Sequence, residues 1–177
     1  EIGDGTVIRE YVTIHRSGNE NGVTRVGKGC LLMAYSHLEH DCEIGDQVVI
    51  VNSTSLAGHV IVEDGAFISA LVGVHQFVRI GRYAMVAGLA GVNQDVLPYS
   101  TVEGNRARLL SANAVGLKRA NFKPNVRAAI KKALKFISQP ELNTKQAVEK
   151  IESEIEMFDE INYLINFIKN SSRGVTK

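Results

Sequence analysis

A six-residue repeat is the feature that most restricts how this chain can fold. Stepping by six residues gives twelve consecutive aliphatic side chains, namely Val26, Leu32, Leu38, Ile44, Ile50, Leu56, Val62, Ile68, Val74, Ile80, Val86 and Val92. Upstream, Ile2, Ile8 and Ile14 keep the same step. The residue two positions before each of the twelve is small or β-branched. A period of six fits neither an α-helix, with about 3.6 residues per turn, nor a simple alternating strand.

A period of six is instead typical of the hexapeptide β-helix. Each hexad supplies one short strand and one corner, and three hexads close one triangular coil. The aliphatic side chain points inward, and successive coils stack about 4.8 Å apart through strand hydrogen bonds. We therefore expect an all-β parallel β-helix over residues 1–98. The polar stretch 15–25, rich in Gly and Asn, should form a loop that projects from one corner.

Beyond Pro98 the hexads stop and helix-like patterns follow. We expect a short helix over residues 111–120 and a second from Pro124, which suits a first helical position, to about Ser138. Thr144 should cap a third helix, and a last one should run through 161–168. Residues 99–177 are thus predicted to be a small helical C-terminal domain.

Composition narrows the class of protein. Hydrophobic residues make up 45% and charged residues 22% of the 177, which is ordinary for a globular protein. Two Cys are too few for a disulfide framework, and Cys30 and Cys42 fall at small inward positions of the hexads. No apolar run approaches the roughly 18–20 residues of a transmembrane segment, and we expect no signal peptide. Because the chain starts with Glu1 in the middle of a pattern, we interpret it as a piece of a longer protein.

The coil length of three hexads also predicts which residues are neighbours. At a spacing of 18, three columns run side by side: Glu39, Ala57 and His75; then His40, Gly58 and Gln76; then Asp41, His59 and Phe77. His37 precedes them on the same coil. Ionisable side chains thus converge on one strip of an otherwise aliphatic and Gly-rich surface, which favours a functional site over separate packing roles.

The residue types in this strip suit proton transfer. His is the natural general base near neutral pH, and Asp41 could orient the imidazole of His40. Gly58 could bring a backbone N–H to a developing oxyanion. No Ser or Cys is placed as a nucleophile. A zinc cluster built from His37, His40 and Cys42, with His59 and His75, is the rival interpretation; we expect no metal, because Cys42 is in the inward register.

The motifs, in chain order, resemble those of the UDP-N-acetylglucosamine 3-O-acyltransferases of lipid A biosynthesis. They are VTIHR at 12–16, HDC at 40–42, LAGHV at 56–60, VHQF at 74–77, QDV at 94–96, EGNRA at 103–107, GLKR at 116–119 and SRG at 172–174. The resemblance implies a left-handed β-helix. It also implies transfer of an (R)-3-hydroxyacyl group from phosphopantetheine-linked acyl carrier protein to the 3-OH of UDP-N-acetylglucosamine, without a further cofactor.

Residue roles follow from the resemblance. His40 would be the general base, Asp41 its partner, and the Gly58 amide the oxyanion donor. The residues expected to contact sugar, phosphate or the pantetheine arm are His37, His59, His75 and Gln76, and those expected to hold the nucleotide are Asn113 and Arg119. Gly88 matches a position that limits acyl length, and its lack of a side chain predicts a longer acyl chain.

A basic segment points to the carrier protein. Between Glu103 and Glu141 there are nine Lys or Arg and no acidic residue. Acyl carrier protein is acidic, so we expect contacts from Lys123, Arg127 and Lys131. No aromatic base-stacking platform supports nucleic-acid binding. The resemblance also implies a homotrimer with sites between subunits, in the bacterial cytoplasm.

Some features depart from the family pattern, and two other functions remain open. The family has further N-terminal coils, Val115 stands where some members have an acid, and Ala120 stands where a second Arg is common. The first alternative is the related N-acyltransferase that acts on the next acylated glucosamine intermediate. The second is a non-catalytic trimeric β-helix scaffold.

Overall fold

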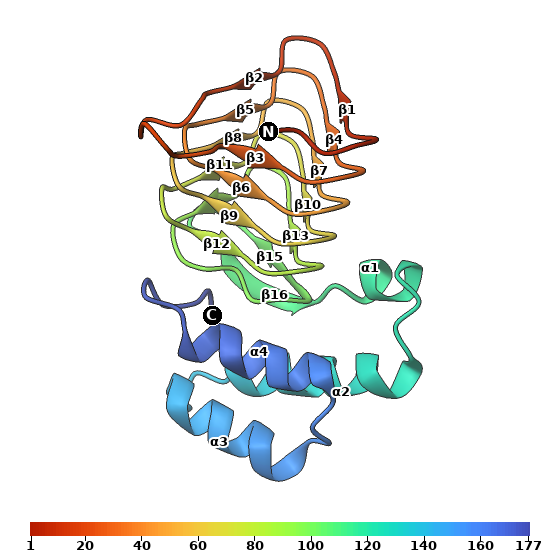
Figure 1. Ribbon diagram of the computed structural model, residues 1–177. Coiled ribbons are helices and arrows are strands. Elements are labelled where there is room, and N and C mark those ends of the chain that lie inside the picture. Colours follow the sequence, from red (N-terminus) through yellow and green to blue (C-terminus); the bar gives the residue numbers. More distant parts are fainter.

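The computed structural model describes residues 1–177 and consists of a β-helix followed by four α-helices (Figure 1). The β-helix begins with fourteen strands of two residues each. They are β1 Val7–Ile8, β2 Thr13–Ile14, β3 Arg25–Val26, β4 Leu31–Leu32, β5 His37–Leu38, β6 Glu43–Ile44, β7 Val49–Ile50, β8 Ser55–Leu56, β9 Ile61–Val62, β10 Phe67–Ile68, β11 Gly73–Val74, β12 Arg79–Ile80, β13 Met85–Val86 and β14 Gly91–Val92.

Each coil contributes one strand to each of three sheets, which gives the coil its triangular section. The sheets run β1-β4-β7-β10-β13-β15-β16, β2-β5-β8-β11-β14 and β3-β6-β9-β12. All pairs among β1–β14 are parallel. Phe67 pairs with Val49 on one side and Met85 on the other, so paired residues in the regular coils, from β3 onward, are three hexads apart. The predicted fold class, a parallel β-helix of hexapeptide coils followed by helices, is confirmed.

The interior of the β-helix is a single aliphatic core. All twelve residues of the six-residue series are buried, together with the small residues two positions before them. Cys30 and Cys42 are among these buried residues, as expected. Burial raises the pKa of the Cys42 thiol to about 11, so this thiol stays protonated and acts as a small apolar side chain.

The first complete coil is longer than the others. Thr13 pairs with His37, and Ile2 bridges to Val26, so the residues of both pairs are four hexads apart rather than three. The extra hexad lies in the loop between β2 and β3. This loop does not simply project from its corner, because Ser17 is only 7% exposed and is turned back against the next coil.

The segment after the last regular hexad differs from the prediction. Residues 100–112, expected to belong to the helical part, form β15 (Ser100–Glu103) and β16 (Arg108–Ala112). β15 pairs in parallel with β13 and in antiparallel fashion with β16. Val102 is fully buried and belongs to the β-helix core. The hairpin therefore continues one sheet past the end of the hexad pattern, and the first helix begins later than expected.

The helices form a second core. They are α1 (Ala114–Arg119), α2 (Pro124–Ile137), α3 (Thr144–Glu154) and α4 (Asp159–Lys169). α2 starts at Pro124 as predicted, but Asn143 rather than Thr144 caps α3, through a reciprocal bond with Gln146. None of the four has the length and apolar character needed to cross a membrane.

Several contacts attach the helices and the C-terminal segment to the coils, which lie above the helices in Figure 1. From α4, the Tyr163 hydroxyl donates to Glu63, whose carboxylate also accepts from Arg79 at 2.8 Å. After α4, the C-terminal segment returns to the β-helix, where Val175 bridges to Asp95. The C-terminus therefore ends beside the last coils, close to the strip of ionisable residues.

Candidate active site

The register of three hexads brings His40, Gly58 and Gln76 together. Each of the three lies three residues after the first residue of β5, β8 or β11, and these strands are neighbours in one sheet. The backbone confirms the stacking, because the His59 N–H donates to the His40 carbonyl at 3.1 Å. The three residues predicted from the spacing to be neighbours therefore do stack on one another, at the corner of the β-helix just after this sheet.

His40 and Asp41 form a hydrogen-bonded pair although they are adjacent in sequence. His40 Nδ1 lies 2.8 Å from Asp41 Oδ2. Side chains of consecutive strand residues point to opposite faces, but Asp41 occupies the corner with φ of 61°, in the left-handed region. This backbone conformation turns the carboxylate toward the imidazole. The corner therefore creates a pair that strand geometry alone would forbid.

Asp41 is held as an anion by its surroundings. Its side chain is only 11% exposed and accepts hydrogen bonds from Ser17 Oγ, from the Gly18 N–H at 3.3 Å, and from His40. The Ser17 hydrogen bond first, and then the His40 bond, lower the Asp41 pKa from 3.8 to about 2. An ionised carboxylate can only accept, so His40 Nδ1 donates to it, and in the neutral imidazole Nε2 is then the nitrogen that carries the lone pair.

His40 Nε2 lies against Gly58. A Cβ added at Gly58 would stand 2.9 Å from both Cε1 and Nε2 of His40. A side chain at this position would therefore force the imidazole to move. The Gly58 N–H makes no hydrogen bond within the chain, whereas the neighbouring N–H groups of Ala57 and His59 are both bonded. A free backbone donor and an unprotonated ring nitrogen thus lie side by side.

His59 and Phe77 surround this pair on the same corner. The His59 ring meets the His40 ring edge to face, with centroids 5.2 Å apart, and it stacks on Phe77 at 4.7 Å. His59 Nε2 lies 3.9 Å from Asp41 Oδ2. Gln76 is exposed on the coil beyond. His59 and Gln76 are therefore both within the predicted strip, and their side chains are available to a ligand.

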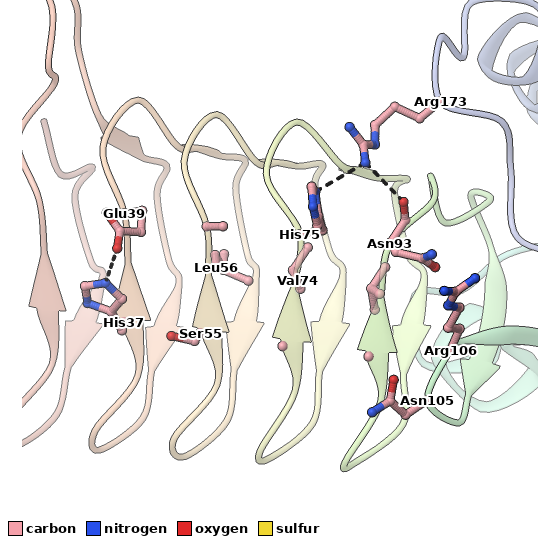
Figure 2. Close-up of a pocket in the computed structure, with 14 residues that line it drawn as sticks. His37, Glu39, Ser55, Leu56, Val74, His75, Asn93, Asn105, Arg106 and Arg173 are labelled. Carbon is pink, nitrogen blue, oxygen red and sulfur yellow. Dashed lines mark hydrogen bonds and ion pairs between the residues drawn. The ribbon is translucent and has the colours of Figure 1, made fainter.

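A groove of about 690 Å³ runs along the outer face of the same sheet. Figure 2 shows it between His37 and Glu39 at one end and Arg106 at the other, with His75 and Asn93 along its edge. The glycines of β11 and β14 form part of its floor, so the floor has few side chains. His40 does not line this groove. It lies three residues after His37, which does line the groove, at the next corner of the coil.

Arg173 reaches this groove from the C-terminal segment (Figure 2). Its Nη2 donates to His75 Nδ1 at 3.2 Å and to the Asn93 carbonyl at 3.4 Å. The segment is fixed by Ser171, which donates to Asp95 at 2.7 Å. The SRG motif was the available signal for Arg173, but nothing in the spacing indicated which coil it would touch.

A second cluster at the groove contains one residue, His15, that the spacing missed. His15 Nδ1 lies 3.1 Å from Glu39 Oε2, and His37 Nε2 lies 3.2 Å from Glu39 Oε1. Only His37 of the three was among the predicted site residues. His15 precedes Glu39 by four hexads, not three, because of the long first coil. The rule of three hexads per coil therefore could not find it.

Two other groups of predicted residues lie elsewhere on the single chain. Asn113 caps α1 and donates to the Tyr83 carbonyl at 2.9 Å, and with Arg119 it lines a separate groove of about 440 Å³. Gly88 is exposed on the corner between β13 and β14. Neither group is brought to His40 within this chain.

The three cations predicted to contact a carrier lie on or beside α2. Lys123 is the residue before the helix, and Arg127 and Lys131 follow at intervals of four, which places them along one helical face. Lys123 and Lys131 are exposed, and Arg127 is partly buried. This face presents positive charge to solvent, with Lys135 one turn further on.

The geometry groups two sets of possible metal ligands. One is His15, His37 and Glu39; the other is His40, Asp41 and His59. Cys42 belongs to neither, because its Sγ is buried and donates to the Ala57 carbonyl at 3.2 Å. The zinc cluster considered from the sequence, which relied on Cys42, is therefore not assembled.

Comparison with known families covers both parts of the chain. The family described as Udp N-acetylglucosamine O-acyltransferase, Domain 2, matches residues 95–176. The family described as bacterial transferase hexapeptide (six repeats) matches residues 24–58. The first match spans the end of the coils, the hairpin and the helices, and the second lies within the regular coils.

Individual relatives agree with these families. Acyl-[acyl-carrier-protein]--UDP-N-acetylglucosamine O-acyltransferases from Gloeothece citriformis and Anaeromyxobacter sp. strain K are 51% and 41% identical over 86% and 99% of this chain. The chain spans 55% and 69% of their respective lengths. A UDP-N-acetylglucosamine acyltransferase structure from Francisella novicida has a TM-score of 0.90 at 38% identity, covering 99% of this chain and 64% of that one.

Proposed function

The chain belongs to the family of UDP-N-acetylglucosamine O-acyltransferases, and from that membership we propose that it transfers an (R)-3-hydroxyacyl group from acyl carrier protein to the 3-hydroxyl of UDP-N-acetylglucosamine. This reaction would be the first step of lipid A biosynthesis. The observation that carries the proposal is the His40–Asp41 pair, whose free Nε2 lies beside an unbonded Gly58 N–H.

The proposed mechanism is direct attack on the thioester. His40 Nε2 takes the proton of the sugar 3-hydroxyl as that oxygen bonds to the thioester carbon. Asp41 keeps the proton on Nδ1 and stabilises the imidazolium that forms. The Gly58 N–H donates to the oxyanion of the tetrahedral intermediate, and the carbon–sulfur bond then breaks. The His40 imidazolium returns its proton to the departing thiolate.

The parts of this mechanism have known magnitudes. A positioned general base contributes about 10²–10⁴-fold, and one oxyanion donor about 10²–10³-fold. No nucleophilic side chain is needed, which agrees with the buried, protonated state of Cys42. We propose no further cofactor, because the thioester donor supplies the activated acyl group.

Substrate contacts follow the two grooves. We propose that His37, His59, His75 and Gln76 contact the sugar, the phosphates or the pantetheine arm. Asn113 and Arg119, which share a groove of their own, would hold the nucleotide. The cationic face of α2, with Lys123, Arg127 and Lys131, would receive the acidic carrier protein through long-range attraction.

We further propose a homotrimer with its sites between subunits. Tyr35, Leu71 and Leu89 occupy equivalent corner positions, with the exposed Ser53 between the first two, and are 60%, 57% and 72% exposed; exposed apolar side chains of this size suit burial against another copy. Gly88 is next to Leu89 and distant from His40 on its own chain. A neighbouring copy could therefore bring Gly88 and the nucleotide groove to the His40 corner.

The names of the relatives favour the O-acyltransferase over the two alternatives. The N-acyltransferase alternative has no counterpart among the curated relatives described above. A scaffold would have no use for the His40–Asp41 pair stacked over Gly58. Since acyl carrier protein and nucleotide sugars are made in the cytoplasm of bacteria, we propose that location for the reaction.

The decisive experiment measures acyl transfer by the purified protein from a panel of 3-hydroxyacyl carrier proteins to UDP-N-acetylglucosamine. We expect turnover, and a loss of about 10²–10⁴-fold in His40→Ala. Circular dichroism and molar mass from light scattering provide the control for folding and assembly. A folded trimer without turnover on any donor would support the scaffold, and turnover only on an acylated glucosamine acceptor would support the N-acyltransferase.

A test of the shared site uses two inactive variants. When the His40→Ala and Asn113→Ala chains are co-expressed, the mixed trimers should regain part of the activity. Some of their sites would then combine an intact His40 from one chain with an intact Asn113 from its neighbour. Each variant alone should stay inactive. Mixed trimers with no recovery would place the whole site on one chain.

A further inference from the structure

A second ionisable cluster, separate from the His40–Asp41 pair, lies at the His37 end of the groove. We propose that His15, His37 and Glu39 bind a divalent first-row transition-metal ion, with Zn²⁺ as the best fit. The three offer two imidazole nitrogens and one carboxylate, a donor set that suits zinc and related ions better than Mg²⁺ or Ca²⁺. The proposal goes beyond acyl transfer, which needs no metal.

The ligand atoms already converge. His15 Nδ1 and His37 Nε2 lie 3.1 and 3.2 Å from the two oxygens of Glu39, and all three ligand groups lie within 4.8 Å of one another. Bonds of about 2.0–2.1 Å in a tetrahedron place neighbouring ligands roughly 3.4 Å apart. The His15–Glu39 and His37–Glu39 separations are close to this edge length, although each histidine faces a different oxygen of Glu39, so the carboxylate would bind through both oxygens or turn to present one. The third separation, between the two imidazole nitrogens, is within 4.8 Å.

The backbone that carries these side chains is fixed. His37 is in β5 and Glu39 follows it by two residues, so both side chains are on the outer face of the sheet. His15 follows Thr13 of β2 by two, on the same face of the neighbouring strand. The His15 N–H donates to the Leu38 carbonyl at 2.9 Å. A site on paired strands is held more precisely than one on a loop.

Thr13 supplies the outer contact that metal-binding histidines usually have. Its Oγ1 lies 2.6 Å from His37 Nδ1. A hydroxyl can accept as well as donate, so Thr13 can accept a hydrogen bond from Nδ1–H, the tautomer in which Nε2 is unprotonated and free for a metal. Without metal, the same hydroxyl can donate to Nδ1 while Nε2–H bonds to Glu39. One contact thus supports both forms.

Glu39 is also more available than the carboxylate of the other cluster. Asp41 already accepts from Ser17, Gly18 and His40, and a metal would have to displace these bonds. The oxygens of Glu39 accept only from the two histidines that would become its fellow ligands. The site is open to solvent, with the His15 side chain 53% exposed and Glu39 36% exposed. An ion from solution can therefore enter and leave.

The test is calorimetric titration of the full chain, without an affinity tag, with ZnCl₂ and separately with MgCl₂ at pH 7.5. We expect about one Zn²⁺ per chain and no binding of Mg²⁺. Glu39→Ala and His15→Ala should each weaken Zn²⁺ binding at least tenfold. Thr13→Val should weaken it by roughly 10-fold or more, the cost of losing an outer-shell partner, while Thr13→Ser should retain it.

One control separates this site from the catalytic pair. His59→Ala, which removes a ligand of the other cluster, should leave Zn²⁺ affinity unchanged. Because binding is read by heat and stoichiometry, the outcome does not depend on the proposed acyl transfer.

Three results would overturn the proposal. They are no Zn²⁺ uptake by the unmodified chain at millimolar metal, equal affinity in Glu39→Ala, or a loss of binding in His59→Ala but not in His15→Ala. The last result would move the metal to the His40 corner. If Zn²⁺ does bind and acyl transfer is also observed, occupancy of His37 should make Zn²⁺ an inhibitor of that transfer.

Discussion

Replacing Gly58 by Ala should reduce the rate of acyl transfer without unfolding the protein. The new methyl would lie 2.9 Å from Cε1 and Nε2 of His40, well inside the 3.4 Å at which ordinary van der Waals contact begins. The imidazole would therefore have to move by several tenths of an ångström. A displacement of about 1 Å in a reacting group can cost about 10²-fold, which corresponds to roughly 2.7 kcal/mol in the barrier.

The assay is initial-rate kinetics with separate kcat and KM. We expect kcat of Gly58→Ala to fall by up to about 10²-fold with KM little changed, because the N–H is retained and the groove is untouched. Gly73→Ala is the control for stability, since a methyl there meets nothing within 4 Å and should leave the melting temperature unchanged. A wild-type kcat in Gly58→Ala, or a loss only in KM, would refute the idea that His40 packs on Gly58 in the reactive state.

Three further predictions test other contacts. Ser17→Ala should raise the pKa of Asp41 from about 2 toward 3.8, so the variant should be less stable than wild type at neutral pH. The difference in melting temperature between wild type and variant should narrow as the pH falls from about 4 to about 2, because Asp41 then becomes protonated in both. A difference that does not change with pH would contradict this prediction. Tyr163→Phe should lower the free energy of unfolding, measured by urea denaturation, by about 1.5–3 kcal/mol, the usual value of a hydrogen bond to a charged group. An unchanged denaturation midpoint would show that Glu63 does not help to hold α4. Gly88→Met should shift the preferred acyl donor to a shorter chain, and the same chain-length profile as wild type would rule out a role for Gly88.

The regular coils were predictable because the repeat encodes them residue by residue. Each aliphatic residue of the series is buried, and Cys30 and Cys42 occupy the small inward positions assigned to them. The stacking of His40 on Gly58 followed from the same arithmetic. The helix from Pro124 was also predictable, since an amphipathic pattern and a proline at its start are local signals.

The predictions from sequence were wrong or incomplete in the segments that do not follow the regular six-residue repeat. The hairpin that holds Val102 lies past the last hexad, and its strands are specified by pairing with β13 rather than by their own pattern. His15 was missed because the coil at that one place contains four hexads and not three. Asn143 was missed as a cap because two capping residues stand side by side, and only the reciprocal bond with Gln146 decides between them.

The sequence alone therefore determined the β-helix, its inward residues and the neighbours along each column, because these depend on a repeat that every regular coil obeys. The tertiary structure decided how the non-repeating segments close on that frame. It turned Asp41 toward His40 through a left-handed corner, placed Ser17 of the long loop on Asp41, and returned Arg173 to the groove beside His75, far from it in sequence. Such contacts join residues with no shared pattern, so only the folded backbone fixes them.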